Sequence, residues 1–478
     1  MLERTMNRNL NGYERYNAAE IYTIRMRLDD QPGALAAALE AIEREGAHVG
    51  NVRLDGMDSR CKLRSVQLFL VDDDHRARVL DALGALDGVE VLEVLDEVME
   101  VHRGGTIETV GRVSLDSLMD LRMVYTPGVA KVCERIVEAP EAARDFTALG
   151  NKMAIATNGT AVLGLGDIGP LAALPVMEGK AAILHRFVGV SAEPLLVDSK
   201  DPEEIVETVA RCALGYGAIQ LEDISAPTCF RVERELQDRL DVPVFHDDQH
   251  GTATVCVAGL KSALAEVGRR PEACEAVVMG SGAAGTAIAR FLTDLGVADV
   301  VVVDRAGAIW DGREESMNDE KRRLAAETNR DRQQGGLETV MRGKNLFVGV
   351  SRPNLVSKEM VRSMAKDPIV FALANPVSEI SVRDAVEAGA AVALDGRGMN
   401  NALAYPGIFR GALEARASRI TPKMMLAAAD ALSEHARQGG TMLPDMMDPK
   451  VHRRVTRAVA DAVDGKDGVL AGSDPHAI

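Results

Sequence analysis

Two pairs of neighbouring carboxylates are the residues best placed to do chemistry. Glu222 and Asp223 stand in IQLEDISAP, and Asp247 and Asp248 stand in VPVFHDDQHGT, each pair directly after an apolar, strand-like segment. The carboxyl ends of strands in an α/β sheet face the ligand crevice, so the two pairs can converge there. Carboxylate oxygens are the ligands that Mg²⁺ and Mn²⁺ prefer. The sequence therefore predicts a divalent-cation site, although either pair alone would be typical of a solvated surface.

Four further side chains can carry or orient protons. Lys180, in PVMEGKAAIL, stands between an expected loop and an expected strand, where burial near a cation would suit it for general-base work; the alternative is a surface lysine. Tyr125, in a Pro-Gly turn, is either a packing residue or a proton donor. His246 and His250 flank the second acidic pair. With four acids available and no cysteine nearby, we expect them to support the acids rather than to bind zinc.

The stretch GSGAAG predicts a dinucleotide site. It follows the strand-like EAVVM, opens an Ala-rich helix and is followed by a strand that ends at Asp304. Such glycines let the backbone approach a pyrophosphate at a helix N-terminus, and the strand-end acid accepts hydrogen bonds from ribose hydroxyls. The expected cofactor contacts are Gly280, Ser281, Gly282, Ala283, Ala284, Gly285, Asp304 and Arg305.

The choice between NAD and NADP depends on the surroundings of Asp304. A carboxylate there repels a 2′-phosphate and favours NAD. Arg305 and Arg313 lie close enough in sequence to hold such a phosphate, so NAD leads and NADP remains possible. A second match to the glycine pattern, GLGDIG at 164–169, runs into Pro170 without an apolar-periodic helix, and we expect a tight turn that lines a site.

The first hundred residues predict a small domain of their own. Strands and helices alternate in a β-α-β-β-α-β order, the ferredoxin-like plan in which two helices cover one face of an antiparallel sheet. The turn DDQPGAL, in this topology, resembles the ACT domain, which implies either effector binding or dimerisation. The expected strands are 21–28, 49–54, 63–71 and 89–95, and the expected helices are 34–45 and 74–86.

The rest of the chain predicts an α/β layer structure in two parts. The proposed domains are 1–97 (ACT-like), 98–245 (substrate and catalytic) and 246–478 (a Rossmann-type, doubly wound NAD-binding domain). The expected strands of the second domain are 153–156, 160–165, 181–187, 193–197 and 218–221. Those of the third are 276–279, 300–303, 346–350, 369–373 and 391–393.

Composition excludes several protein classes. Of 478 residues, 46% are hydrophobic and 27% are charged, which is ordinary for globular domains. The net charge of −17 argues against nucleic acid and anionic membranes as partners. A polar start without a long apolar run predicts a cytoplasmic protein, and six scattered cysteines predict free buried thiols.

Taken together, these motifs resemble the malic enzyme family, in its shorter bacterial branch, across residues 105–465. The larger eukaryotic members carry an arginine where this chain has Ala161 and Val162, so the malate carboxylate must find another cation here. The motifs are Tyr125–Ala130, Asn158–Pro170, Glu178–Lys180, Glu222–Asp223, His246–Thr252, the 280–285 loop, Ala374–Pro376 and Gly398–Asn401.

The resemblance implies oxidative decarboxylation of L-malate to pyruvate and CO₂ with reduction of NAD. Lys180 would take the proton of the C2 hydroxyl, Asp247 would position Lys180, and Tyr125 would protonate C3 of enolpyruvate. Mg²⁺ or Mn²⁺ would be held by Glu222, Asp223 and Asp248. Asn375 and Asn401 would face the nicotinamide or the substrate carboxylate.

The resemblance also implies a homodimer or larger homo-oligomer, with a possible small effector at the ACT-like domain. Three alternative functions remain open at this point. Two are enzymes, an NADP-preferring malic enzyme and a 2-hydroxy acid dehydrogenase that does not decarboxylate. The third is an effector-binding regulatory protein that retains a degenerate catalytic shell.

Overall fold

The computed structural model describes residues 20–375 and 377–463, and it divides the chain into two compact units, Met1–Glu108 and Thr109–Ile478. Pro376, which belongs to one of the motifs above, lies outside the described residues. Within the described ranges, no helix has the length and apolar character needed to cross a membrane.

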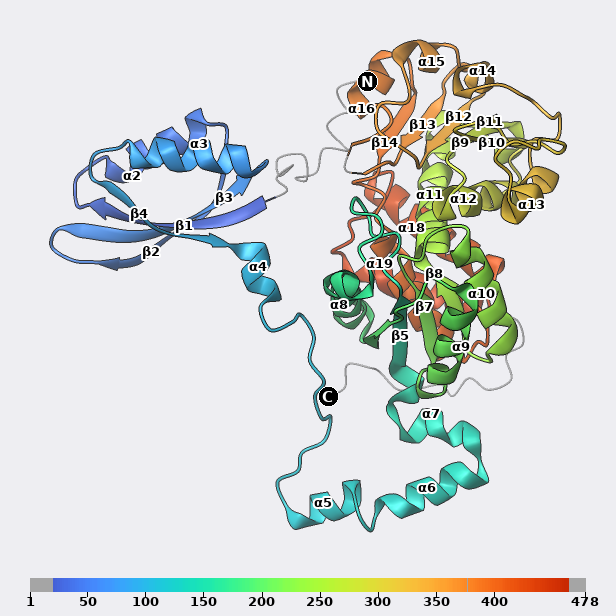
Figure 1. The fold of residues 1–478 in the computed structure, drawn as a ribbon, viewed down its shortest axis with the longest axis horizontal. Helices are drawn as coiled ribbons and strands as arrows, with labels where there is room; N and C mark the ends of the chain where they lie inside the picture. The colour runs from blue at the N-terminus through green and yellow to red at the C-terminus, as the bar shows by residue number, and fades with distance from the viewer. Residues whose placement is uncertain (1–19, 376, 464–478) are drawn as a thin grey trace. The chain divides into compact units, whose positions relative to one another are not determined.

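The first unit has the predicted β-α-β-β-α-β order and an antiparallel sheet with the strand order β2-β3-β1-β4 (Figure 1). Alternate residues of β1, namely Ile24, Met26 and Leu28, are buried against the two helices, as a one-sided sheet requires. Its elements are β1 (Glu20–Asp29), α2 (Ala34–Arg44), β2 (His48–Met57), β3 (Cys61–Leu70), α3 (Asp73–Gly84), β4 (Val89–Asp96) and the short α4 (Glu97–His102).

The second unit opens with helices that bury little of their surface and continues into a parallel sheet. None of the residues of α5 (Leu118–Val124) or α6 (Val129–Glu138) is buried. The parallel sheet has the order β6-β5-β7-β8, and its apolar residues form one core with two of the helices that connect its strands, α9 and α10. Its elements are α7 (Ala143–Phe146), β5 (Lys152–Thr157), α8 (Pro170–Val188), β6 (Ser191–Leu196), α9 (Pro202–Cys212), β7 (Ala218–Leu221), α10 (Thr228–Arg239) and β8 (Val244–His246).

A six-stranded sheet follows, with the order β11-β10-β9-β12-β13-β14 and only β11 antiparallel. This is the doubly wound, Rossmann-type arrangement that the sequence predicts. The elements are α11 (Asp247–Val267), β9 (Glu275–Met279), α12 (Ala283–Asp294), β10 (Asp299–Asp304), β11 (Gly307–Ala308), α13 (Asp319–Glu327), α14 (Leu337–Met341), β12 (Leu346–Gly349), α15 (Lys358–Arg362), β13 (Ile369–Ala372), α16 (Val382–Glu387) and β14 (Val392–Asp395).

The last helices return to the first parallel sheet. Helix α17 (Tyr405–Glu414) contacts both α8 and α19 (Pro449–Asp461), and α18 (Pro422–Gly439) packs along α11. This return brings the segment around Asn401 close to the carboxyl ends of β7 and β8. The 3₁₀ turns are η2 (Pro140–Ala142), η3 (Ala148–Asn151), η4 (Ala213–Gly215), η5 (Pro271–Ala273) and η6 (Asn401–Leu403).

Two predicted strands are wrong. Residues 181–187 belong to α8, because a short apolar run cannot be told from a buried helix by its pattern alone. Residues 160–165 form an irregular loop, stabilised by one isolated bridge between Val162 and Gly166. Pro170 is the first residue of α8, so the absence of a helix after GLGDIG is wrong as well. Proline favours that first helical position, where its missing N–H has no partner to lose.

Candidate active site

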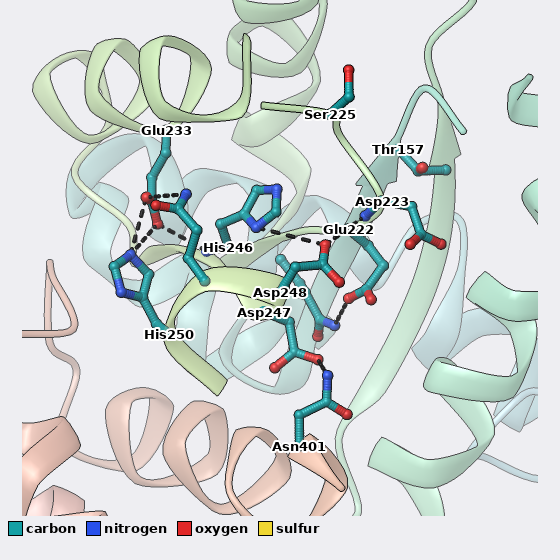
Figure 2. A network of polar contacts seen from close by, with 12 residues as sticks. Thr157, Glu222, Asp223, Ser225, Glu233, His246, Asp247, Asp248, His250 and Asn401 are labelled. Atoms are coloured by element: carbon teal, nitrogen blue, oxygen red, sulfur yellow. Dashed lines mark hydrogen bonds and ion pairs between the residues drawn. The ribbon is translucent and has the colours of Figure 1, made fainter. Parts of the chain in front are cut away.

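The two acidic pairs meet at the carboxyl ends of neighbouring strands. Leu221 of β7 pairs with His246 of β8, so the residues that follow, Glu222 and Asp247, leave the sheet side by side. One carboxylate oxygen each from Glu222, Asp223 and Asp248 lies within 4.8 Å of the others. Figure 2 shows these side chains gathered at the start of α11. The structure thus brings together the residues proposed as metal ligands.

Backbone and side-chain hydrogen bonds fix these carboxylates. The N–H of Asp223 donates to Oδ2 of Asp248 at 2.9 Å, and Nε2 of Gln220 donates to Oε2 of Glu222 at 2.7 Å. Gln220 and Glu222 stand two residues apart along the chain, so their side chains leave β7 on one side. Asp223 itself has a φ of 53°, an uncommon conformation for a non-glycine residue. The backbone after β7 therefore has an uncommon conformation at the point where the acids converge.

Lys180 points into the same cluster, from a helix rather than from the expected loop. Its Nζ lies 2.5 Å from Oδ2 of Asp247 and 2.8 Å from Oε1 of Glu222. Burial alone would lower the pKa of Lys180, but the carboxylates of Asp247 and Glu222 outweigh it and hold the pKa well above its usual value. Without a cation at the acids, Lys180 is therefore an ammonium ion.

Two residues near the start of α17 complete the surroundings of Lys180. Nδ2 of Asn401 donates to Oδ2 of Asp247 at 2.7 Å, so the predicted substrate residue also holds the carboxylate that holds Lys180. The ring of Tyr405 lies 4.8 Å from Nζ of Lys180 in a cation–π contact. Sequence reasoning missed Tyr405. Its place just after the Asn401 motif was the available signal.

Burial and mutual repulsion raise the pKa of each carboxyl group. Burial, then Asp248 and Glu222, raise the pKa of Asp223 to about 8. Burial also raises the pKa values of Asp247 and Asp248 to about 6 and that of Glu222 above its usual value. One lysine cannot balance three buried acids and the partly buried Asp248. A divalent cation fits this set of hard oxygen donors and would supply the missing positive charge.

The acids predict a pH-dependent stability for the metal-free protein. The pKa of Asp223 is raised from 3.8 to about 8 on folding, so the folded chain binds more protons than the unfolded chain between those values. Stability must therefore fall as pH rises through this window. We expect a lower Tm at pH 8 than at pH 6 in EDTA, and a larger gain from Mn²⁺ at pH 8. Thermal melts of the wild type and of Asp223→Asn check this, because the variant should lose much of the slope.

Tyr125 is a predicted catalytic residue that does not lie beside Lys180 and the acids. Its side chain is 67% exposed, between α5 and α6. Within the described residues, its only hydrogen bonds are backbone bonds to Leu121 and Val129. One chain alone does not bring this phenol to Lys180.

The GSGAAG loop has the geometry that the sequence predicts for a pyrophosphate site. It joins β9 to α12, whose first turn begins at Ala283 after Gly282. A Cβ on Gly285 would lie 2.0 Å from the carbonyl oxygen of Gly280, and one on Gly280 would meet Val350 at a φ of 123°. These glycines allow the close backbone packing that leaves the helix N-terminus open to a phosphate.

Asp304 ends β10 as predicted, but its carboxylate is already engaged. Arg313 donates to both oxygens, at 3.0 and 2.6 Å, and Nζ of Lys321 donates at 2.7 Å. Although burial alone raises it, hydrogen bonds from Arg313 and Lys321 bring the pKa of Asp304 below its usual value. Arg305 is exposed, and Asn375, three residues after the end of β13, is exposed as well. Lys321 is the residue of this cluster that sequence reasoning missed.

The histidines and cysteines need one correction. His246 is fully buried, and burial lowers its pKa, so it is neutral; its Nδ1 lies 3.7 Å from Oδ2 of Asp248. All six cysteines are free, as expected, but Cys133 and Cys212 are exposed and Cys61 is only partly buried.

Comparison with known proteins agrees with this site. Residues 105–201 match the malic enzyme N-terminal domain, and residues 249–399 and 384–466 match the malic enzyme NAD binding domain. The chain is 41% identical over 470 residues to the NAD-dependent malic enzyme of Geobacillus stearothermophilus, covering 95% of this chain and 98% of that one. It is 46% identical over 382 residues to the bifunctional malic/malolactic enzyme of Bacillus subtilis, covering 78% and 93%.

A solved structure gives the same result. The NAD-dependent malic enzyme of Thermotoga maritima superposes with a TM-score of 0.72 at 42% identity, covering 76% of this chain and 98% of that chain. The predicted family is confirmed, and the regulatory protein with a degenerate shell is not supported. The chain belongs to the malic enzyme family.

Proposed function

We propose that this chain oxidises and decarboxylates L-malate to pyruvate and CO₂, with NAD as the hydride acceptor and Mg²⁺ or Mn²⁺ as the metal. The observation that carries the proposal is the contact of Lys180 with Asp247 and Glu222 beside the carboxylates of Asp223 and Asp248. A base and a cation site share one small volume, which is what removal of a hydroxyl proton next to a carboxylate requires.

Each residue of the cluster has a distinct role in this proposal. Glu222, Asp223 and Asp248 would hold the cation, which would act as a Lewis acid toward the substrate oxygens. Lys180 accepts the C2 hydroxyl proton as hydride leaves C2 for the nicotinamide. Asp247 and Asn401 orient Lys180 through the chain of hydrogen bonds described above. Positive charge on the cation also reduces the negative potential that keeps Lys180 protonated.

The direct test is an assay with L-malate, Mn²⁺ and either NAD or NADP, with pyruvate measured in the same reaction. We expect reduced cofactor and pyruvate in equal amounts, and no turnover in EDTA. Reduced cofactor with oxaloacetate and no enzyme-dependent pyruvate would instead identify a 2-hydroxy acid dehydrogenase that does not decarboxylate.

We infer that the preference for NAD depends on the ion cluster at Asp304. The carboxylate of Asp304 forms ion pairs with Arg313 and Lys321, which could otherwise bind a 2′-phosphate. We expect Asp304→Ala to raise kcat/KM for NADP relative to NAD about tenfold, since it frees Arg313 and Lys321 for the phosphate. Steady-state kinetics with both cofactors measure this ratio, and Asp311→Asn, which breaks an exposed ion pair with Arg332, is the matched control. An unchanged ratio in Asp304→Ala would contradict the inference.

We further propose a homodimer in which Tyr125 of one copy serves the site of the other. Apolar side chains are exposed on α5, including Leu118 (78%) and Met123 (61%). A second exposed apolar group, Leu171 and Val176, lies on α8, the helix that carries Lys180. Contact between these two surfaces in a pair of chains would cover both and bring a Tyr125 toward Lys180.

The first unit is proposed as an ACT-like module that binds a small effector or contributes to assembly. Its support is the β-α-β-β-α-β order and the turn at Gly33, whose φ of 95° admits the sharp entry into α2. Comparison of the full chain with a chain that begins after Glu108, in turnover and in oligomeric state, tests this assignment.

A further inference from the structure

Glu233 is a buried carboxylate that the proposed reaction does not use. It lies on α10, is 5% exposed and accepts three hydrogen bonds from one short segment. The backbone N–H of His246 donates to it at 2.9 Å, Nε2 of Gln249 at 2.9 Å, and Nε2 of His250 lies 3.0 Å away. Such a group costs free energy to bury and is expected to have a structural or functional reason.

The three donors surround the two acids of the site. His246 directly precedes Asp247 and Asp248, and Gln249 and His250 directly follow them. His246 and His250 are four residues apart, which is about one helical turn, so a single carboxylate fixes both ends of the first turn of α11. His246, at the N-cap of α11, makes no side-chain capping hydrogen bond there. Glu233 thus anchors the turn from a neighbouring helix.

The anchored turn presents its acids on the side away from Glu233. Figure 2 shows Glu233 and His250 on one side of His246, and Asp248, Glu222 and Asp223 on the other. Oδ2 of Asp248 receives the N–H of Asp223 at 2.9 Å, a contact that a small rotation of α11 would break. The direction of the Asp248 carboxylate therefore depends on how firmly this turn is held.

We propose that Glu233 is a positioning residue of the cation site, which acts through His246, Gln249 and His250 to aim Asp248 at the metal. The inference rests on the proposed function, because it presumes a divalent cation at Glu222, Asp223 and Asp248. It assigns to Glu233 the role of an outer residue that orients a metal ligand without contacting the metal. Loss of such outer partners costs metal affinity even when every ligand remains.

The test is Mn²⁺ binding to the metal-free full-length chain, measured by the electron paramagnetic resonance signal of free Mn²⁺ without malate or cofactor. Glu233→Gln keeps the size of the side chain but replaces one carboxylate oxygen with an NH₂ group. That group cannot accept the hydrogen bonds of His246, Gln249 or His250. We expect its Mn²⁺ Kd to rise about tenfold or more. Glu235→Gln is the matched control, because Glu235 is on the same helix and forms an ion pair with the exposed Arg231. Its Kd should stay within about twofold of the wild type.

Binding of NADH, followed by its fluorescence, separates positioning from general loss of structure. It should be unchanged in Glu233→Gln, since the GSGAAG loop lies on other elements. A parallel loss of NADH binding, or an unchanged Mn²⁺ Kd, would overturn the inference. If Glu233→Gln does not fold, His250→Ala provides the test. We expect its Mn²⁺ Kd to rise, and an unchanged Kd would overturn the inference. A wild type that binds no Mn²⁺ would instead overturn the cation site of the proposed function.

Discussion

Lys180→Ala should lower kcat about a thousandfold, the range of effect found when a positioned general base is removed. Nζ of Lys180 is the only side-chain nitrogen that forms ion pairs with Asp247 and Glu222 in the described part of the chain. No neighbouring base can replace it, because Tyr405 is a phenol whose pKa is raised by burial, and the nearby carboxylates would be ligands of the proposed cation. Initial rates of NADH formation at saturating malate and Mn²⁺ measure the loss.

Two companion variants separate proton transfer from charge. Lys180→Arg keeps a cation beside Asp247 but cannot lose a proton near neutral pH, so it should be as inactive as Lys180→Ala. Lys152→Ala removes another lysine of the same unit, which pairs with Glu193 at 2.9 Å, and should keep most of the activity. Substantial turnover by Lys180→Arg would contradict the role of Lys180 as the base.

Sequence reasoning predicted the strand-end geometry of this site well, for a simple physical reason. Parallel strands such as β7 and β8 are short, buried along their whole length and free of acidic residues, so their ends are marked by the first carboxylates. Glu222 and Asp247 are those residues. The same logic located the GSGAAG loop between β9 and α12.

Around Lys180, the hydrophobic pattern of the sequence does not distinguish a helix from a strand. Helix α8 contains Pro175 and Gly179, both unfavourable inside a helix, and then an apolar run that suits a strand equally well. Packing against β6 and α17 stabilises the helix in spite of these residues. That is a tertiary effect, which local propensity does not contain.

Asp304 shows a second limit of sequence reasoning. Its partners stand 9 and 17 residues later, in a loop and at the start of α13, and only the fold brings them back. The carboxylate was expected to face a ribose, whereas the structure pairs it with Arg313 and Lys321. Side-chain partners across a loop are not encoded in strand or helix periodicity.

Mixing two inactive variants should restore activity if Tyr125 acts in the site of another copy. Tyr125→Phe and Lys180→Ala each disable one function, and a dimer that contains one of each has one doubly defective site and one intact site. Random exchange makes half of the dimers mixed, so about a quarter of all sites recover. Rates of NADH formation, followed after the variants are unfolded and refolded together, measure this recovery against each variant refolded alone.

The arrangement of residues predicts which pairs can complement and which cannot. Lys180 and Asp248 lie in one cluster of the same chain, so Lys180→Ala mixed with Asp248→Asn should stay inactive and provides the control. If Tyr125 instead reached Lys180 of its own chain, every site of every mixed dimer would carry one defect, and no activity would return. The exposed apolar residues on α5 and α8 favour the first outcome, because a second copy of the chain would cover both surfaces at once. Complementation would therefore explain why a proposed proton donor stands in solvent within its own chain.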